Sequence, residues 1–257
     1  MKVVILAGGL GTRLSEETGM RPKPMVEIGG KPILWHIMKI YSHFGFNDFV
    51  ICAGYKNYFI KEYFANYVLH NTSITVDLKN NAIEYHKSEI DPWKVTIVDT
   101  GNDTLTGGRI KRVEPYLDNR PFLLTYGDGV GNIDIPALIE SHKNSGKHCT
   151  LTTVQPVGRF GVIDIEPSGA VSQFHEKPTE GGTWINGGFF VCQPEIFKLL
   201  NHDYDIWEKA PLETLANTGQ LNAFKHQGFW RPMDTLKDKN DLNDLWENKQ
   251  AEWKLWE

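Results

Sequence analysis

Cysteines and long apolar segments are scarce in this chain, and each scarcity excludes a class of protein. The three cysteines, Cys52, Cys149 and Cys192, show no CxxC spacing. Cys52 and Cys192 end apolar runs and are predicted to be small core residues of a reduced, cytoplasmic protein that has no disulfide framework. No apolar run approaches ~18 residues, the length that a membrane-spanning helix requires. An apolar strand pattern follows Met1 and Lys2 directly, so we expect no signal peptide and no membrane partner.

An excess of positive charge is also missing. The chain has 27 lysines and arginines against 32 aspartates and glutamates, for a formal net charge of −5. Because nucleic-acid-binding domains usually carry a basic surface, we expect no nucleic-acid partner. The cations that bind an anionic ligand must therefore be local. The 257 residues are 40% hydrophobic, which is enough for a sizeable core.

Linkers, internal repeats and low-complexity tracts are absent as well. In the first half, strand patterns alternate with helix patterns, which implies right-handed crossovers and a mostly parallel sheet. We therefore predict one domain over 1–257 of α/β class. It should have a Rossmann-like, mostly parallel mixed sheet flanked by helices, with a smaller β lobe in the second half. The predicted strands are 3–6, 48–53, 95–98, 122–126, 149–154, 162–165, 171–174, 184–192 and 221–226. The predicted helices are 32–44, 57–65, 135–145, 194–200, 211–217 and 235–257.

A glycine-rich loop follows the first strand, in the segment Leu6-Ala7-Gly8-Gly9-Leu10-Gly11-Thr12-Arg13. Glycines let the backbone approach anionic oxygens, and Arg13 and Lys23 supply fixed positive charge for a polyphosphate. The loop lacks the Gly-Lys-Ser/Thr ending of a Walker loop, and Leu14 stands where a dinucleotide fingerprint needs its last glycine. A tight strand-to-helix turn would explain the glycines alone. Together with the two cations, they favour a phosphate site.

The pattern Gly-Gly-x-Gly-Thr-Arg-Leu, followed by Lys23-Pro24-Met25, resembles the signature of the sugar-1-phosphate nucleotidyltransferases. The resemblance extends to about residue 240. It implies the nucleotide-diphospho-sugar transferase fold, with a nucleotide-binding half at about 1–130, a sugar-binding half at about 131–240 and a C-terminal helix at about 235–257. It also implies a homo-oligomer, a role in bacterial surface polysaccharide (O-antigen) synthesis, and direct in-line transfer in which Arg13 and Lys23 act on the phosphates.

Two aspartates are candidate Mg²⁺ ligands. Asp128 follows a predicted strand in a Gly-Asp-Gly turn, and Asp234 precedes a predicted helix. Carboxylates beside phosphates suit Mg²⁺, and the resemblance implies that both hold it. Without the resemblance, Asp128 could be a turn residue and Asp234 a helix N-cap.

The resemblance also implies a site for the sugar phosphate. In Phe174-His175-Glu176-Lys177-Pro178, Lys177 would pair with the phosphate and Glu176 would accept from sugar hydroxyls. Lys23 would bridge the α-phosphate and the sugar phosphate. Asn186 and Gly187 would contact the hexose. An ordinary charged loop and a strand bulge are the alternatives for these two segments.

The segment 99–109 departs from the base-reading pattern of thymidylyl- and uridylyltransferases and resembles the cytidylyltransferase branch. A cytosine reader must accept a hydrogen bond from the exocyclic amino group. We expect Thr104 to do so and Arg109 to steer phosphate or sugar groups. Alternatively, Thr106 is the N-cap of a helix that this loop opens. The residues predicted to bind nucleotide are Leu6, Ala7, Gly8, Gly9, Gly11, Thr12, Arg13, Thr104, Arg109 and Gly127.

These features predict an enzyme whose substrates are CTP and glucose 1-phosphate, with Mg²⁺ as cofactor. The choice of glucose rests on the resemblance alone. A transferase for another base, such as UTP or dTTP, or for another sugar phosphate remains open. A non-catalytic subunit that binds nucleotide sugars is a further alternative, although Arg13, Lys23, Asp128, Lys177 and Asp234 are all present.

Overall fold

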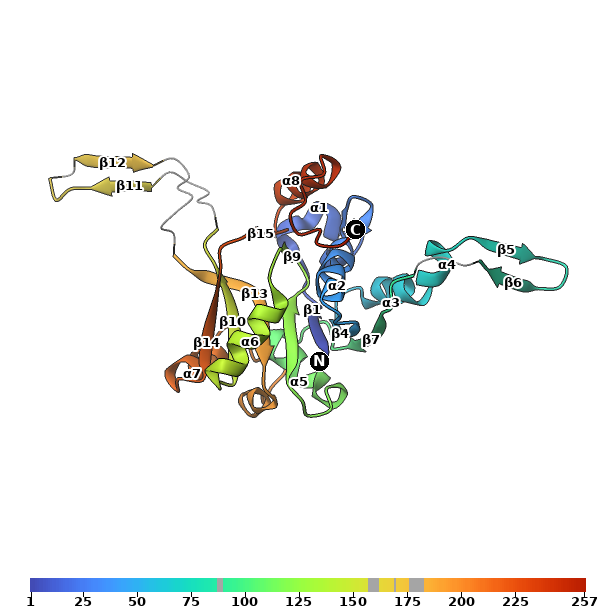
Figure 1. Ribbon diagram of the computed structural model, residues 1–257, viewed down its shortest axis with the longest axis horizontal. Coiled ribbons are helices and arrows are strands. Elements are labelled where there is room, and N and C mark those ends of the chain that lie inside the picture. The colour runs from blue at the N-terminus through green and yellow to red at the C-terminus, as the bar shows by residue number, and fades with distance from the viewer. Residues whose placement is uncertain (87–89, 157–161, 169, 176–182) are drawn as a thin grey trace.

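A computed structural model describes residues 1–86, 90–156, 162–168, 170–175 and 183–257. Its centre is a seven-stranded sheet (Figure 1). In sheet order the strands are β14 (Leu221–His226), β10 (Cys149–Val154), β13 (Ile185–Cys192), β8 (Phe122–Tyr126), β1 (Val3–Ala7), β4 (Asp48–Ala53) and β7 (Lys94–Asp99). All neighbours in this sheet are parallel except β13, which runs antiparallel to both β10 and β8. The predicted α/β class and mostly parallel sheet are confirmed.

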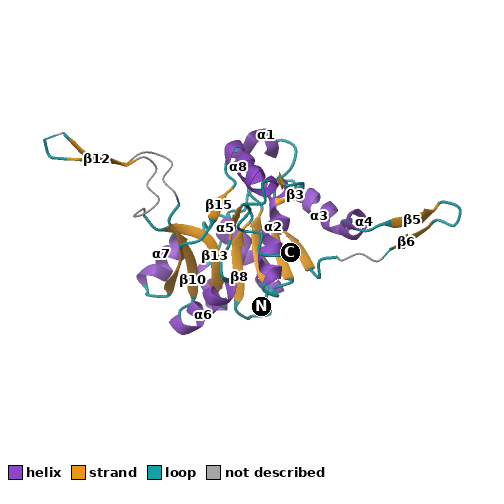
Figure 2. Ribbon diagram, turned by 45° about the horizontal axis from the view of Figure 1, so that its top comes forward, coloured by secondary structure: helices purple, strands orange, loops and turns teal. Residues whose placement is uncertain are grey.

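Helices cover both faces of the sheet (Figure 2). Side chains alternate along β1, so Val3 and Ile5 join one core cluster and Val4 and Leu6 join the other. The first cluster includes residues of α2 (Ile33–His43) and α6 (Ile135–Ser145), and the second includes residues of α5 (Thr106–Val113). The remaining α-helices are α1 (Ser15–Thr18), α3 (Asn57–Ala65), α4 (Tyr67–Asn71), α7 (Ala210–Asn217) and α8 (Leu236–Glu247). No helix in the described ranges is long and apolar enough to cross a membrane.

Small sheets and short helices surround this core. The two-stranded sheets pair β2 (Glu27–Ile28) with β3 (Lys31–Pro32), β9 (Gly129–Gly131) with β15 (Trp230–Pro232), β5 (Ile74–Asp77) with β6 (Ala82–Tyr85), and β11 (Val162–Ile165) with β12 (Val171–His175). The 3₁₀-helices are η1 (Thr12–Leu14), η2 (Lys23–Met25), η3 (Glu114–Tyr116) and η4 (Pro194–Leu199). The segment predicted as a helix over 194–200 is therefore a 3₁₀-helix, which is a tighter winding than the α-helix.

The two hairpins differ in how well the sequence predicted them. The strands of β11–β12 were predicted, whereas β5–β6 was not. The strands predicted over 184–192 and 221–226 join the central sheet as β13 and β14, so the smaller β lobe reduces to the β11–β12 hairpin. Both hairpins project away from the sheet (Figure 1).

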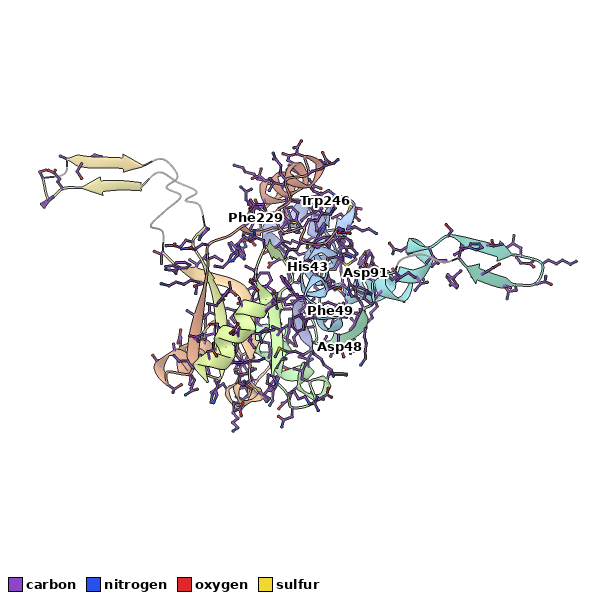
Figure 3. All side chains as sticks on the ribbon, in the orientation of Figure 1. His43, Asp48, Phe49, Asp91, Phe229 and Trp246 are labelled. Carbon is purple, nitrogen blue, oxygen red and sulfur yellow. The ribbon has the colours of Figure 1, made fainter. Side chains whose placement is uncertain are left out.

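The C-terminal segment differs from the single helix predicted over about 235–257. Helix α8 ends at Glu247, and Lys249 adopts a left-handed backbone with φ of 59°. The chain then turns so that Trp253 is fully buried and stacks against Phe229 and Trp246, which are labelled in Figure 3. Burying this indole outweighs continuing the helix. The segment packs on the chain's own core, to which Leu242 and Trp253 belong.

Candidate active site

The carboxyl ends of β1 and β8 open onto a cavity of about 540 Å³. Ligands in α/β sheets bind at this edge. Every residue predicted to bind nucleotide lines the cavity, and so do Lys23 and Asp128. The full lining is Leu6, Ala7, Gly8, Gly9, Leu10, Gly11, Thr12, Arg13, Lys23, Pro24, Asn102, Asp103, Thr104, Leu105, Thr106, Arg109, Tyr126, Gly127 and Asp128. The fold thus brings two segments about 100 residues apart in sequence, Leu6–Arg13 and Asn102–Arg109, to one cavity.

Lys23 lies at the centre of the charged part of the site. Its Nζ is 2.8 Å from Asp128 Oδ2 and 2.7 Å from Asp234 Oδ1. Arg13 Nη1 is 2.9 Å from Asp234 Oδ2. Lys23 is 8% exposed, whereas the Arg13 side chain is 73% exposed. The sequence predicted all four residues for the phosphates and the metal, and the structure places them in one cluster.

The pairing of β9 with β15 brings the two aspartates together. Asp128 precedes β9, and Asp234 follows β15 after one residue. The Met233 N–H donates to the Asp128 carbonyl at 2.8 Å, which locks the two segments side by side. Asp234 is not the N-cap of α8, because Thr235 takes that position in a capping box with Asp238. That alternative for Asp234 is wrong.

Burial and charge act against each other at Lys23. Burial lowers the pKa of its ammonium group, but Asp128 and Asp234 outweigh burial and raise the pKa above its ordinary value of 10.5. Lys23 is therefore charged over the physiological pH range. Its protonated form holds two carboxylates that would otherwise repel each other.

Arg109 lines the cavity, and its guanidinium is held by acceptors of the protein itself. It is only 4% exposed, and its guanidinium donates to Thr100 Oγ1 at 2.7 Å, to the Gly101 carbonyl at 2.7 Å and to the Asn102 carbonyl at 3.2 Å. A Cβ on Gly8 or Gly54 would overlap this guanidinium. The side chain thus fixes the loop at 100–102 beneath the glycine loop. Its role in steering phosphate or sugar groups stays a prediction.

The loop before α5 holds the predicted base reader. Thr104 lines the cavity and is 6% exposed. Thr106 is not an N-cap, since the helix begins at Thr106 itself and Leu105 takes the N-cap position without a side-chain hydrogen bond to the helix. Instead, Thr106 Oγ1 donates to Glu208 Oε2 at 2.7 Å and accepts from the Trp207 N–H at 2.9 Å. The alternative that this loop merely caps α5 through Thr106 is therefore wrong.

The predicted sugar residues are only partly described. Glu176 and Lys177 lie outside the described residues. Asn186 and Gly187 lie in β13, and Asn186 Nδ2 donates to Tyr126 Oη at 3.0 Å. Tyr126 lines the cavity, and Asn186 is linked to the cavity wall through its hydrogen bond to Tyr126.

Sequence reasoning missed several residues at the site. Tyr126 and Glu208 hydrogen-bond to each other, and Gly54 makes room for Arg109. Tyr126 carried a signal, because it is the last residue of a buried strand directly before Gly127-Asp128. Glu208 carried none, since it lies in an irregular segment about 80 residues later in the chain.

Comparisons with known proteins show the family of this chain. A family model described as nucleotidyl transferase matches residues 2–247. The chain belongs to the nucleotidyl transferase family. Glucose-1-phosphate cytidylyltransferases from Salmonella typhi and Salmonella typhimurium are each 58% identical over 258 aligned positions, covering 100% of this nucleotidyl transferase and 100% of the relative. The crystal structure of HddC from Yersinia pseudotuberculosis superposes with a TM-score of 0.69 at 27% identity, covering 95% of this chain and 99% of that one.

Replacing Lys23 by alanine tests the centre of this cluster. We expect kcat to fall about 100-fold or more, because a buried charge directed at phosphates is lost, while circular dichroism shows an intact fold. Since the pKa of Lys23 is raised, the stability it contributes should be constant below about pH 10.5 and be lost only at higher pH. Urea unfolding of both proteins from pH 7 to 11 measures this difference.

Lys143→Ala, an exposed change on α6, is the matched control and should leave turnover and the alkaline profile unchanged. Wild-type turnover in Lys23→Ala would contradict the role of Lys23. If the difference in free energy of unfolding between wild type and Lys23→Ala already shrinks between pH 7 and 9, the raised pKa of Lys23 is contradicted.

Proposed function

We propose that this nucleotidyl transferase is a glucose-1-phosphate cytidylyltransferase, which converts CTP and α-D-glucose 1-phosphate into CDP-glucose and pyrophosphate. The observation that carries the proposal is the 58% identity to the Salmonella enzymes over the whole length of both chains. The cavity supports it, because a glycine loop, two cations and two carboxylates meet at the edge of the sheet where nucleotides bind.

The reaction needs no covalent enzyme intermediate. A phosphate oxygen of glucose 1-phosphate forms a bond to the α-phosphorus of CTP. The bond from that phosphorus to the bridging oxygen breaks, and pyrophosphate leaves with the electron pair. Catalysis is then positioning and charge stabilisation. Arg13, exposed at the rim, would neutralise the β- and γ-phosphates, and buried Lys23 would hold the α-phosphate against the incoming phosphate.

The residues present also fit Mg²⁺. Asp128 and Asp234 offer hard oxygen ligands, and both carboxylates contact the same Lys23 ammonium group. Within the described residues, no group of three or more His, Cys, Asp or Glu side chains gathers as a closed metal cage. Mg²⁺ ordinarily takes one or two carboxylates and completes its shell with substrate phosphates and water. Bound there, it would supply charge stabilisation to the leaving pyrophosphate.

Thr104 is our proposed reader of cytosine. It is nearly buried in the cavity wall, and its hydroxyl can accept from the exocyclic amino group of cytosine. Uracil presents a carbonyl at that position, and that carbonyl cannot donate. A threonine hydroxyl whose own proton is donated elsewhere can only accept, and it discriminates against uracil because it is left unpaired.

Pyrophosphate release with glucose 1-phosphate and CTP, UTP, dTTP, ATP or GTP in parallel tests the proposed reaction. We expect release with CTP and little with the others. In Thr104→Val, the preference for CTP over UTP should fall about tenfold, as one hydrogen bond to the base is lost. Release with a different nucleotide would overturn the base assignment, and silence with all five would overturn the proposed reaction with this sugar phosphate.

The Mg²⁺ proposal has its own test. Asp128→Asn should raise the Mg²⁺ concentration for half-maximal turnover by at least about tenfold, because a charged oxygen ligand becomes a neutral one. Asp118→Asn, an exposed change in an ion pair with Lys2, is the control. An identical Mg²⁺ titration in Asp128→Asn would mean that Asp128 serves only to hold Lys23.

We also propose that the enzyme is a homo-oligomer in which the β5–β6 hairpin contacts a second copy of the chain. The hairpin register pairs Ile74 with Tyr85 and Val76 with Ile83, which places these four side chains on one face. They are 36–51% exposed. A lone two-stranded hairpin is marginally stable in water, so an apolar face of this kind needs a partner.

Light scattering after size-exclusion chromatography tests this contact. Val76→Lys should convert the wild-type oligomer to a smaller species, because the charge would be buried in the contact. Ala82→Lys introduces the same residue on the opposite face of the hairpin and should leave the mass unchanged. A monomeric wild-type protein, or an equal effect of both changes, would contradict the proposal.

A further inference from the structure

Tyr126 and Glu208 form a hydrogen-bonded relay between the two halves of the site. Tyr126 Oη donates to Glu208 Oε1 at 2.6 Å and accepts from Asn186 Nδ2 at 3.0 Å. Glu208 Oε2 accepts from Thr106 Oγ1 at 2.7 Å. Thr106 and Tyr126 line the cavity, while Asn186 belongs to the strand predicted to contact the hexose. The relay therefore runs from the start of α5 to β13.

The direction of each hydrogen bond in this relay is set by the carboxylate. An ionised carboxylate only accepts, so the single hydroxyl proton of Tyr126 must face Glu208. The Tyr126 oxygen can then only accept from Asn186. The amide of Asn186 must present Nδ2 to it, while Asn186 Oδ1 accepts from the Gly188 N–H at 2.8 Å. Both ends of the amide specify the same orientation.

Packing holds the relay in place. Gly188 has φ of 79°, and a Cβ there would lie 2.5 Å from Tyr126 Cδ2, so the tyrosine ring fills the space that this glycine leaves. Trp207, directly before Glu208, is fully buried and lies edge-on to Phe190, which also contacts the Tyr126 ring edge-on. A tyrosine hydroxyl is both donor and acceptor, so Tyr126 can donate to Glu208 and accept from Asn186 at the same time.

We propose that Tyr126 and Glu208 are positioning residues that fix the orientation of the Asn186 amide for recognition of the hexose hydroxyls. One N–H and one oxygen lone pair of Asn186 remain for a sugar hydroxyl, and their placement depends on the relay. An amide free to rotate would present donor and acceptor in either order and lose part of its binding energy to ordering. This inference rests on the proposed reaction with glucose 1-phosphate.

Steady-state kinetics with a double-mutant cycle test the relay. Tyr126→Phe keeps the ring and removes the hydroxyl, so KM for glucose 1-phosphate should rise about tenfold while KM for CTP changes less than about twofold. In an Asn186→Ala background, the same change should alter KM for glucose 1-phosphate by less than about twofold, because Tyr126 acts through Asn186. A full tenfold effect in that background would overturn the proposal.

Glu208→Gln gives an independent arm. A glutamine can donate as well as accept, which removes the constraint on the hydroxyl proton. KM for glucose 1-phosphate should rise as in Tyr126→Phe. Glu213→Gln, the same chemical change at an exposed position of α7, should have no effect. Equal KM values for Glu208→Gln and wild type would contradict the role of the carboxylate.

A readout without turnover separates this inference from the proposed function. In NMR spectra of the free protein, the side-chain amide signal of Asn186 is identified by its absence from the spectrum of Asn186→Ala. Its hydrogen exchange should accelerate in Tyr126→Phe, since one N–H loses its acceptor. Unchanged exchange would overturn the relay. Accelerated exchange in a protein that releases no pyrophosphate with any nucleotide would uphold the relay and overturn the proposed reaction.

Discussion

The ammonium group of Lys23 is the interaction on which the site depends. It joins the 3₁₀-helix at Lys23–Met25, the turn after β8 and the segment before α8, which are more than 100 residues apart in the chain. Burying a lysine is unfavourable unless carboxylates compensate for its lost hydration, and here Asp128 and Asp234 do so. Each of the three charged side chains compensates for the lost hydration of the others. The residues predicted to bind phosphate and those predicted to bind metal therefore form one charged cluster.

The sequence predicted the strands of the central sheet better than the small strand pairs around it. The central strands at 48–53, 122–126, 149–154 and 221–226 were predicted to the residue, because β-prone segments bounded by turn residues and alternating with helices indicate strands of an α/β sheet. The β5–β6 hairpin was missed although Ile74 and Val76, like Ile83 and Tyr85, stand at alternate positions, because these strands lie outside the central sheet and bury none of their residues in the core. Helix α8 was extended too far because the apolar spacing continues to Trp256, although the chain turns inward at Trp253.

The candidate site was predicted as a set of residues, but not as a set of contacts. Composition and spacing could show that Arg109 is a cation near a glycine loop. They could not show that its guanidinium points inward, between Gly8 and Gly54, because that depends on three segments meeting. The same limit applies to Glu208, whose partners Thr106 and Tyr126 are far from it in sequence. Roles that depend on long-range partners are not encoded in local patterns.

Because β13 runs antiparallel to β8 and β10, its first residues lie at the edge of the sheet where we place the nucleotide. In a purely parallel sheet, the same residues would lie at the opposite edge. Parallel strands deliver only the residues that follow them, whereas an antiparallel strand delivers the residues at its start. Asn186 reaches Tyr126 in this way, beside the register that pairs Phe189 with Thr125. Since side chains alternate in direction along a strand, a slip of one residue between β13 and β8 would turn Asn186 to the other face. The position of Asn186, our proposed contact to the sugar, is therefore tied to the same backbone pairing that buries Phe189 and Phe190 in the two core clusters.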